Sequence, residues 1–297
     1  MFNDATILVM YGVTPCHAGS GSSLGVVDLP IQRERHTNWP MVQASGVKGA
    51  FRANFQFYKD ELKDKQQEID LEKLTENIFG TAAEGSGYAG ALSVSDAKIL
   101  AYPMRSSVAP FVWITCPAVL KRLEKDLTIA GKIVTQKSPD VKIPDVKGAV
   151  AKEIDGVGSG KVLLEDYEVN VSGKAEGIPE SLKPYLKKAE RLLLVSDEVF
   201  NYGVSDCTQI MAQISIDDKT GTTSEGSLRY TEELPSDTIM YSVLQWGKSK
   251  NAENVYQADN VHAFVKKVIG NHIQVGGDET LGRGIFELDW HDAKEAK

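Results

Sequence analysis

The sequence predicts an α+β fold, a ferredoxin-like core with insertions, on three observations. Short apolar runs typical of strands alternate along the chain with apolar stripes of helical period. Their order, with a first strand, a helix, several strands, a late helix and a final strand, is that of an open α+β sheet. Of the 297 residues, 42% are hydrophobic and 25% charged, so the chain can bury a core without disulfides.

The first half of the chain is expected to begin with a strand at 6–13, a Gly/Ser loop and an extended run at 26–31. A helix should start near Ser45, which stands where a helix cap belongs. Apolar residues then recur every three or four positions and predict one buried stripe. The stripe comprises Val47, Phe51, Phe55, Tyr58 and Leu62. Later elements are a helix at 71–79, strands at 91–103 and 111–115, and a short helix at 117–127.

The second half opens with residues 131–160, which are rich in Lys, Asp, Gly, Pro and Val and show no clear period. This composition predicts an insertion. The elements expected after it are mixed helix and strand at 183–195, a strand at 210–216, a turn at 217–221, a strand at 242–246, a helix at 258–269 and a strand at 285–288.

Charge and cysteine content exclude several classes of protein. The balance of 33 Lys and Arg against 41 Asp and Glu gives −8, which argues against a uniformly basic surface but permits a local basic groove. The three cysteines, Cys16, Cys116 and Cys207, lack C-x-x-C spacing and argue against a disulfide framework or a zinc ribbon. No basic leader and no run of about 20 apolar residues occur, so we expect a cytoplasmic protein without membrane contact.

A basic segment lies between residues 31 and 59. Five basic residues and one acid give it a local charge of 5 − 1 = +4; these are Arg33, Arg35, Lys48, Arg52 and Lys59, with Glu34. The helix opens with Ser45-Gly46-Val47-Lys48-Gly49, and free N–H groups at a helix start bind phosphate together with a nearby lysine. The alternative is an ordinary capped helix with a solvated basic face.

Three further features could carry chemistry. His17 and Asp28 flank a Gly/Ser loop, where they could transfer protons or hold a metal, or could be a hydrogen-bonded loop histidine and a turn aspartate. The Gly-rich run 276–284 carries Arg283 and either wraps a phosphate backbone or forms a flexible hairpin turn. The acidic run at 232–235 is typical of a solvated turn.

Several runs together resemble the RAMP superfamily of CRISPR proteins. They are 17–21 (HAGSG), 29–34 (LPIQRE) and 43–52 (QASGVKGAFR). Later runs resemble, more narrowly, the repeated backbone subunit of the type III-B (Cmr) effector complex; they are 91–98 (ALSVSDAK), 113–117 (WITCP), 194–200 (LVSDEVF) and 280–284 (TLGRG). The resemblance covers nearly the whole chain, thins over 131–160, and implies a single domain over residues 1–297.

This resemblance implies an RRM-like, ferredoxin-type palm with inserted subdomains and a thumb-like β-hairpin. It implies self-association into a helical filament along a guide (CRISPR) RNA, with other Cmr-complex subunits as partners. Each copy would cradle a stretch of guide, and its thumb would interrupt the guide–target duplex at regular intervals, where complementary target RNA is cut. The function expected from the resemblance is antiviral defence by RNA-guided RNA cleavage.

The resemblance also implies roles for single residues. Asp28 takes the place of the family's catalytic aspartate, His17 that of its histidine, and Glu232 or Glu233 that of an acidic catalytic residue. The RNA-binding residues implied are Ser45, Gly46, Lys48, Gly49, Arg52, Gly282 and Arg283. The family's usual Ser-Ser-Leu/Ile-Lys-Gly run has Gly46 at its second position here, which removes a hydroxyl but keeps the backbone amide.

Cleavage is expected to depend on a divalent cation, because a bare carboxylate at Asp28 would repel the scissile phosphate. Mg²⁺ or Mn²⁺ held by Asp28 and waters would separate the two, while a protonated Asp28 acting as an acid is the alternative. The target's own 2′-hydroxyl would attack the adjacent phosphate, assisted by His17 and the acidic pair. Two other functions stay open, a non-catalytic subunit that coats guide RNA and an endoribonuclease that processes guide precursors. A metabolic enzyme is disfavoured, since Val162 stands where a P-loop needs Ser or Thr.

Overall fold

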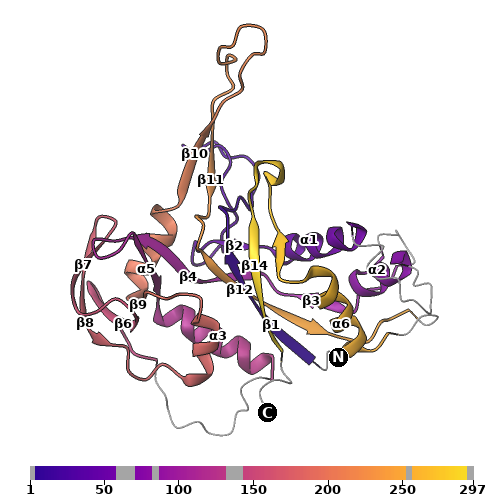
Figure 1. Ribbon diagram of the computed structural model, residues 1–297, viewed down its shortest axis with the longest axis horizontal. Coiled ribbons are helices and arrows are strands. Elements are labelled where there is room, and N and C mark those ends of the chain that lie inside the picture. The colour runs from indigo at the N-terminus through magenta and orange to yellow at the C-terminus, as the bar shows by residue number, and fades with distance from the viewer. Residues whose placement is uncertain (1–3, 58–70, 82–86, 132–142, 252–255, 293–297) are drawn as a thin grey trace.

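A large mixed sheet runs through the protein, and a two-stranded hairpin projects from it (Figure 1). The computed structural model describes residues 4–57, 71–81, 87–131, 143–251 and 256–292. Twelve strands join the sheet, whose main path is β13-β14-β1-β12-β4-β5-β9-β6-β8-β7. Helices flank this path and give the molecule its long axis.

The palm is the part of this sheet ordered β14-β1-β12-β4, in which all neighbours are antiparallel. Helix α1 connects β1 to the β4 side, and α6 connects β12 to β14; the two helices contact each other. This order is that of two interleaved β-α-β units and confirms the expected ferredoxin-like core. The elements are β1 (Asp4–Gly12), α1 (Ala44–Phe57), β4 (Ala97–Arg105), β12 (Ile239–Trp246), α6 (Ala258–Ile269) and β14 (Ile285–Asp292).

Short elements complete the palm. They are β2 (Met41–Val42) beside β4, β3 (Leu92–Val94) beside β12, β13 (His272–Gln274) beside β14, and α2 (Leu71–Phe79), which packs on α1.

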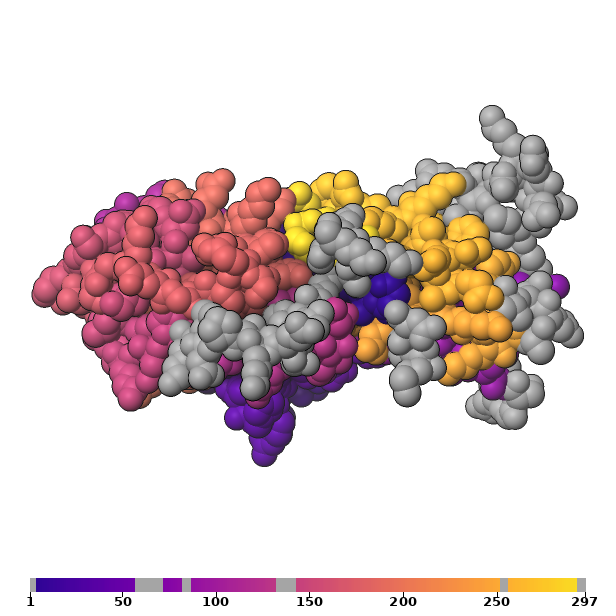
Figure 2. Space-filling view, turned by 90° about the horizontal axis from the view of Figure 1, so that it is seen from below, coloured from indigo at the N-terminus to yellow at the C-terminus, as the bar shows by residue number. Residues whose placement is uncertain are grey.

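A second group of elements extends the sheet beyond β4. Figure 2 shows the face of the molecule away from the hairpin, with this group at one end and α6 at the other. The strands are β5 (Phe111–Thr115), β6 (Val150–Asp155), β7 (Gly160–Leu164), β8 (Tyr167–Lys174) and β9 (Leu192–Val195). The helices are α3 (Pro117–Ile129), η1 (Glu180–Leu182), α4 (Lys183–Leu186) and α5 (Asp197–Asp206).

The hairpin consists of β10 (Gln209–Gln213) and β11 (Arg229–Glu233), and it stands away from the body in Figure 1. It corresponds to the thumb-like hairpin expected from the resemblance. Five large apolar side chains on it are 39–54% exposed; they are Ile210, Ile214, Ile216, Leu228 and Tyr230. The hairpin therefore offers an apolar surface that the rest of this chain does not cover.

Burial explains why the palm elements form. Six consecutive residues of β1 are buried, because helices cover one face of its sheet and the second group of elements lies against the other. On α1, Val47, Phe51 and Phe55 have no exposed surface, which confirms the inner stripe over the described residues. Phe51 meets Trp290 of β14 at a ring-centroid distance of 6.2 Å. Tyr58, Leu62 and the basic Lys59 lie outside the described residues.

Some expected elements differ in the structure. Residues 26–31 form isolated bridges and no strand, since they follow the edge of the hairpin for only a few residues. The expected strand at 91–103 is two strands, β3 and β4, separated by Ser95 and Asp96. Within the expected insertion at 131–160, residues 132–142 lie outside the described part, while β6 pairs with β8 and β9 inside the main sheet.

Candidate active site and RNA interface

The base of the hairpin is where residues 16–33 meet β11. Two stretches of this segment run beside the end of β11 and also pair with each other. The bridges are Cys16 with Leu234, Leu29 with Thr231, and Gly19 with Ile31. His17 and Asp28, on different stretches of the segment, are therefore both held against the same strand.

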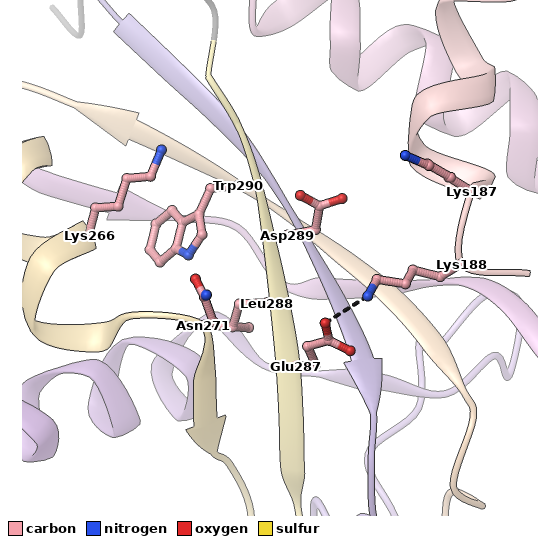
Figure 3. Close-up of a pocket in the computed structure, with 8 residues that line it drawn as sticks. All are labelled: Lys187, Lys188, Lys266, Asn271, Glu287, Leu288, Asp289 and Trp290. Atoms are coloured by element: carbon pink, nitrogen blue, oxygen red, sulfur yellow. Dashed lines mark hydrogen bonds and ion pairs between the residues drawn. The ribbon is translucent and has the colours of Figure 1, made fainter.

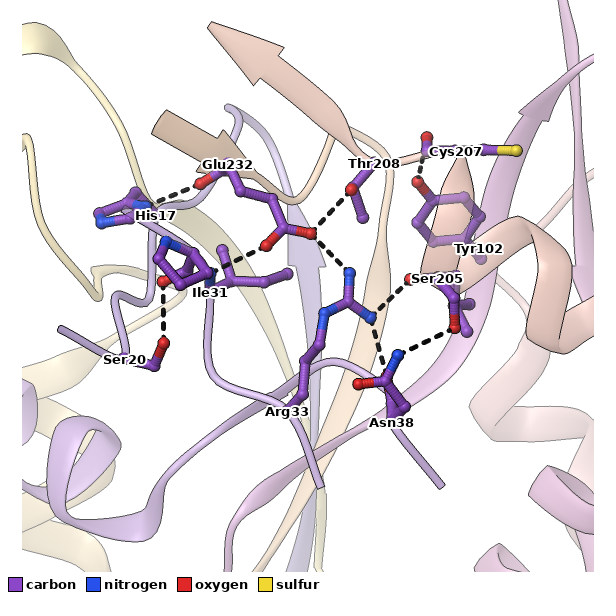
Figure 4. Close-up of polar contacts among 12 residues, drawn as sticks. His17, Ser20, Ile31, Arg33, Asn38, Tyr102, Ser205, Cys207, Thr208 and Glu232 are labelled. Atoms are coloured by element: carbon purple, nitrogen blue, oxygen red, sulfur yellow. Dashed lines mark hydrogen bonds and ion pairs between the residues drawn. The ribbon is translucent and has the colours of Figure 1, made fainter. Parts of the chain in front are cut away.

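The ring of His17 is oriented by a main-chain acceptor. Its Nδ1 lies 2.7 Å from the carbonyl oxygen of Glu232 (Figure 4). Because a carbonyl oxygen can only accept, Nδ1 carries the proton, and Nε2 keeps its lone pair when the imidazole is neutral. Nε2 lies next to Gly19, where an added Cβ atom would stand only 2.7 Å from it. The structure thus holds a hydrogen-bonded loop histidine whose second ring nitrogen is left for other chemistry.

The carboxylate of Asp28 lies against the start of β11. Its Oδ2 accepts a hydrogen bond from the Tyr230 N–H (2.7 Å), and its own N–H donates to the Tyr230 carbonyl (3.1 Å). Asp28 is partly exposed, and the loop before it presents Leu24 and Val26 to solvent. Among the residues that the structure describes, none donates to Oδ1. This oxygen therefore faces outward for an RNA group, a water or an ion.

Glu232 is buried and joins three segments of the chain. Its Oε1 accepts from Arg33 Nη2 (2.5 Å) and Thr208 Oγ1 (2.8 Å), and its Oε2 accepts from the Ile31 N–H (3.1 Å). The other terminal nitrogen of Arg33 donates to two main-chain carbonyls (Figure 4). The solvated turn expected at 232–235 is therefore wrong, because Glu232 is only 6% exposed and Glu233 is fully buried.

Glu233 points to the other side of β11, as alternation along a strand requires. Its Oε1 accepts from Arg283 Nε (2.9 Å), and its Oε2 from Gln209 Nε2 (3.2 Å). Burial, and secondly the charge of Glu233, raise the pKa of Cys16 to about 12. Cys16 is therefore a neutral packing residue at neutral pH. Both acidic residues implied for catalysis are thus engaged in ion pairs with arginines.

The Gly-rich run 276–284 packs against the histidine. At Gly276, φ is +98° and an added Cβ atom would lie 2.7 Å from the His17 carbonyl oxygen, so only glycine allows this approach. The run continues through η2 (Glu279–Leu281) to the exposed Gly282. It forms a fixed wall beside the site, and its Arg283, implied for RNA binding, keeps 26% of its side chain exposed beside Glu233.

The start of α1 is the second part of the candidate interface. The helix begins at Ala44, whose N–H donates to Asp96 Oδ1 (2.8 Å). Ser45 is therefore inside the first turn, and the expectation that it caps the helix is wrong. Ser45, Gly46 and Gly49 are exposed. The first turn thus presents main-chain groups to solvent with little side-chain cover.

Two basic side chains lie behind this first turn. Burial, and secondly the charge of Arg52, lower the pKa of Lys48. Arg52 donates to the Gly80 carbonyl (3.1 Å). The helix start is also tied to the active-site segment, since the Gln43 N–H donates to Gln32 Oε1 (2.7 Å). An anion beside Lys48 would relieve the repulsion between the two cations, as the expected phosphate site requires.

The residues present offer limited ligands for a metal. The described part of the chain contains no group of three or more His, Cys, Asp or Glu side chains placed to hold an ion. Asp28 can supply one carboxylate oxygen. Such a set suits a hard cation that keeps most of its waters and takes further oxygens from RNA.

Sequence reasoning missed three residues that shape this site. Arg33 was counted only in the basic segment, and Thr208 and Tyr230 carried no recognisable motif. Arg33 and Glu232 are 199 residues apart in the chain, so no local spacing could have paired them. The isolated arginine within the run 29–34, opposite a pair of acids elsewhere, was the available signal.

An open groove of about 530 Å³ lies elsewhere, on the palm beside β14 (Figure 3). Its walls carry Lys187, Lys188, Lys266, Glu287 and Asp289. Lys188 is paired with Glu287 at 2.7 Å. Its mixed and largely neutralised charge does not suggest an RNA site.

Comparison with known families identifies the class of protein that this fold and site define. The chain matches the model of the RAMP superfamily over residues 10–287. It therefore belongs to the RAMP superfamily. Among curated proteins, it is 34% identical to "CRISPR system Cmr endoribonuclease Cmr4" of Pyrococcus furiosus, over 96% of this chain and 95% of the relative. It is 25% identical to "CRISPR system CMR subunit Cmr4" of Saccharolobus solfataricus, over 94% of each.

Solved structures agree with this assignment. Oligomeric Cmr4 from Pyrococcus furiosus superposes with a TM-score of 0.69 at 29% identity, over 98% of this chain and 99% of that one. A subunit of the type III-B Cmr-beta complex bound to cognate target RNA gives a TM-score of 0.76 over 100% and 99%; at 23% identity it supports the fold alone. In the part of the chain that the structure describes, no helix has the length and apolar character needed to cross a membrane. A cytoplasmic location stays a prediction.

Proposed function

We propose that this chain is a repeated backbone subunit of a type III-B CRISPR effector complex, which binds guide RNA and cleaves complementary target RNA. The observation that carries the proposal is the joint placement of His17 and Asp28 at the base of an exposed hairpin. The curated relative at 34% identity is named an endoribonuclease of the Cmr system, and a similar solved structure is oligomeric. The proposed partners are guide RNA, target RNA, other Cmr subunits and further copies of this chain.

Guide RNA would bind at the start of α1. Exposed main-chain groups at Ser45, Gly46 and Gly49, with Lys48 and Arg52 behind them, suit a phosphate backbone. These contacts recognise phosphate and carry no base code, so sequence choice would come from base pairing with the guide. Gly282 and the exposed part of Arg283 would extend the contact along the wall at 276–284.

The hairpin would splay the guide–target duplex. Its exposed apolar side chains, among them Ile210, Leu228 and Tyr230, can cover the faces of unstacked bases. Tyr230 also holds Asp28 through its main chain, so a base displaced at the hairpin would leave its phosphate near that carboxylate. This placement would explain cleavage at regular intervals, one for each copy of the chain.

In the cleavage step, the 2′-hydroxyl of the target would attack the adjacent phosphate. Nε2 of His17 can accept or return a proton, because Nδ1 is committed to the Glu232 carbonyl. Asp28 would orient the reacting groups through Oδ1. A divalent cation bound there, Mg²⁺ or Mn²⁺, would offset the repulsion between this carboxylate and the phosphate. Glu232 and Glu233 would act by holding the site together, since arginines already engage both carboxylates.

A reconstituted complex tests the proposal. The assembled subunits with guide RNA are compared as wild type and as Asp28→Asn, which keeps an acceptor for the Tyr230 N–H. An exposed aspartate on the loop before β6 provides the control, Asp145→Asn. Target RNA is supplied with Mg²⁺ or EDTA, and as a copy lacking the 2′-hydroxyl at the expected cut. We expect Asp28→Asn, EDTA and the deoxy target each to stop cleavage without weakening target binding.

Other outcomes would favour the two competing functions. Normal cleavage by Asp28→Asn would make this chain a scaffold that coats the guide, with the chemistry on another subunit. Cutting of a guide precursor by the isolated chain, without target, would make it a processing endoribonuclease. Equal cutting of the deoxy target would rule out attack by the 2′-hydroxyl.

A further inference from the structure

A closed path of hydrogen bonds begins and ends on Glu232. Its carboxylate holds the Ile31 N–H (3.1 Å), and its main-chain carbonyl holds the His17 ring (2.7 Å). Between these two ends, the stretch that contains Ile31 pairs with the stretch that follows His17. The pairing consists of Gln32 N–H to the Ala18 carbonyl (2.7 Å) and Ser20 N–H to the Pro30 carbonyl (2.9 Å). The orientation of His17 therefore depends on where the Glu232 carboxylate is kept.

Arg33 keeps that carboxylate in place. Its side chain is 15% exposed and the carboxylate 8%, so the pair is nearly out of solvent. Nη1 of Arg33 donates to the carbonyls of Asn38 (2.8 Å) and Val204 (2.9 Å), which anchors it to α5 and to the turn at 34–38. Without Arg33, the buried carboxylate of Glu232 would lose its charge partner and would be driven toward water.

We propose that Arg33 is a positioning residue for cleavage, acting through Glu232 on the His17 ring. This inference rests on the proposed function and assigns Arg33, which lies in the basic segment, to the active site and not to RNA binding. Its guanidinium is already committed to one carboxylate and two carbonyls. Thr208, which donates to the same oxygen of Glu232, supports the same position.

A double-mutant cycle in the assembled complex tests this role, with Arg33→Ala, His17→Ala and the combination. Arg33→Ala should slow single-turnover cleavage by about tenfold or more, since misplacing a catalytic group by about 1 Å costs up to about a hundredfold. Guide affinity should stay within about twofold. The double variant should be no more than about twofold slower than the slower single variant, because both changes remove the same oriented imidazole.

Arg122→Ala is the matched control. Arg122 pairs with Glu34 at 2.7 Å and is 22% exposed, a comparable buried ion pair that holds none of the His17 contacts. It should lower thermal stability much as Arg33→Ala does and leave cleavage within about twofold of wild type. If Arg33→Ala prevents assembly, Thr208→Val removes one hydrogen bond to the same oxygen and should give a smaller, equally non-additive loss.

Three results would overturn the inference. Multiplied defects in the double variant would mean that Arg33 acts on stability or on another group. Equal losses from Arg33→Ala and Arg122→Ala would mean a general structural effect. Normal cleavage by His17→Ala, with Asp28→Asn inactive, would refute the positioning role while the proposed function stood; normal cleavage by Asp28→Asn would refute the proposed function itself.

Discussion

Replacing Gly19 by alanine probes the orientation of His17 while leaving its imidazole in place. The added Cβ atom would stand 2.7 Å from Nε2, where ordinary contact begins near 3.4 Å, so the ring must retreat by about 0.7 Å (3.4 − 2.7). That shift strains or breaks the hydrogen bond from Nδ1 to the Glu232 carbonyl, which contributes about 0.5–1.5 kcal/mol. Because small misplacements of catalytic groups are costly, we expect cleavage to slow by about tenfold to a hundredfold.

The assay is single-turnover cleavage of labelled target RNA by the assembled complex, with thermal unfolding and guide affinity measured alongside. Folding should be little affected, since the obstructing atom is the end of a side chain that can move. Gly277→Ala is the control, because its Cβ atom would reach the other side of the ring at 3.4 Å, an ordinary contact distance. Wild-type cleavage by Gly19→Ala, or an equal loss in Gly277→Ala, would refute the assigned orientation.

Three further changes test other parts of the structure. Lys48→Ala should weaken guide binding about tenfold and reduce the salt slope by about 0.7, while exposed Lys121→Ala should do neither; filter binding at several salt concentrations decides this. Gly46→Ser should tighten guide binding about threefold by restoring a hydroxyl, since a Cβ atom there makes only ordinary contact, and an unchanged affinity would count against that role. Burial raises the pKa of Asp292, but hydrogen bonds led by that from His262 outweigh burial and lower it. A lowered folded-state pKa stabilises above the unfolded value and loses that effect as pH falls, so Asp292→Asn should cost about 1–3 kcal/mol near neutral pH and progressively less below about pH 4 in urea unfolding; a pH-independent cost would contradict this.

Local patterns predicted the palm well. The helix at 258–269 and the strand at 111–115 are found at the expected residues, because period and flanking residues together define such elements. The helix starting near Ser45 was expected one residue late. Its cap comes from Asp96, 52 residues away from the Ala44 amide that it binds. A cap supplied from another segment leaves no mark at the helix start.

The acidic pair shows where local reasoning stopped. A Glu-Glu-Leu-Pro run normally lies in solvent, yet Glu232 and Glu233 end a strand and are buried. Arg33 and Arg283 make that burial possible, and they come from opposite ends of the chain. The desolvation of two carboxylates is offset only when these partners arrive through folding, so exposure could not be read from the run itself.

Residue types and order alone therefore specify the alternation of strands and helices, the basic helix start and the presence of His17 and Asp28 as candidates for chemistry. Tertiary structure decides which of these groups meet. The tautomer of His17 follows from a carbonyl 215 residues away, and the outward oxygen of Asp28 from the Tyr230 amide 202 residues away. Periodicity acts between neighbours in the chain, whereas hydrogen bonds and ion pairs act between neighbours in space.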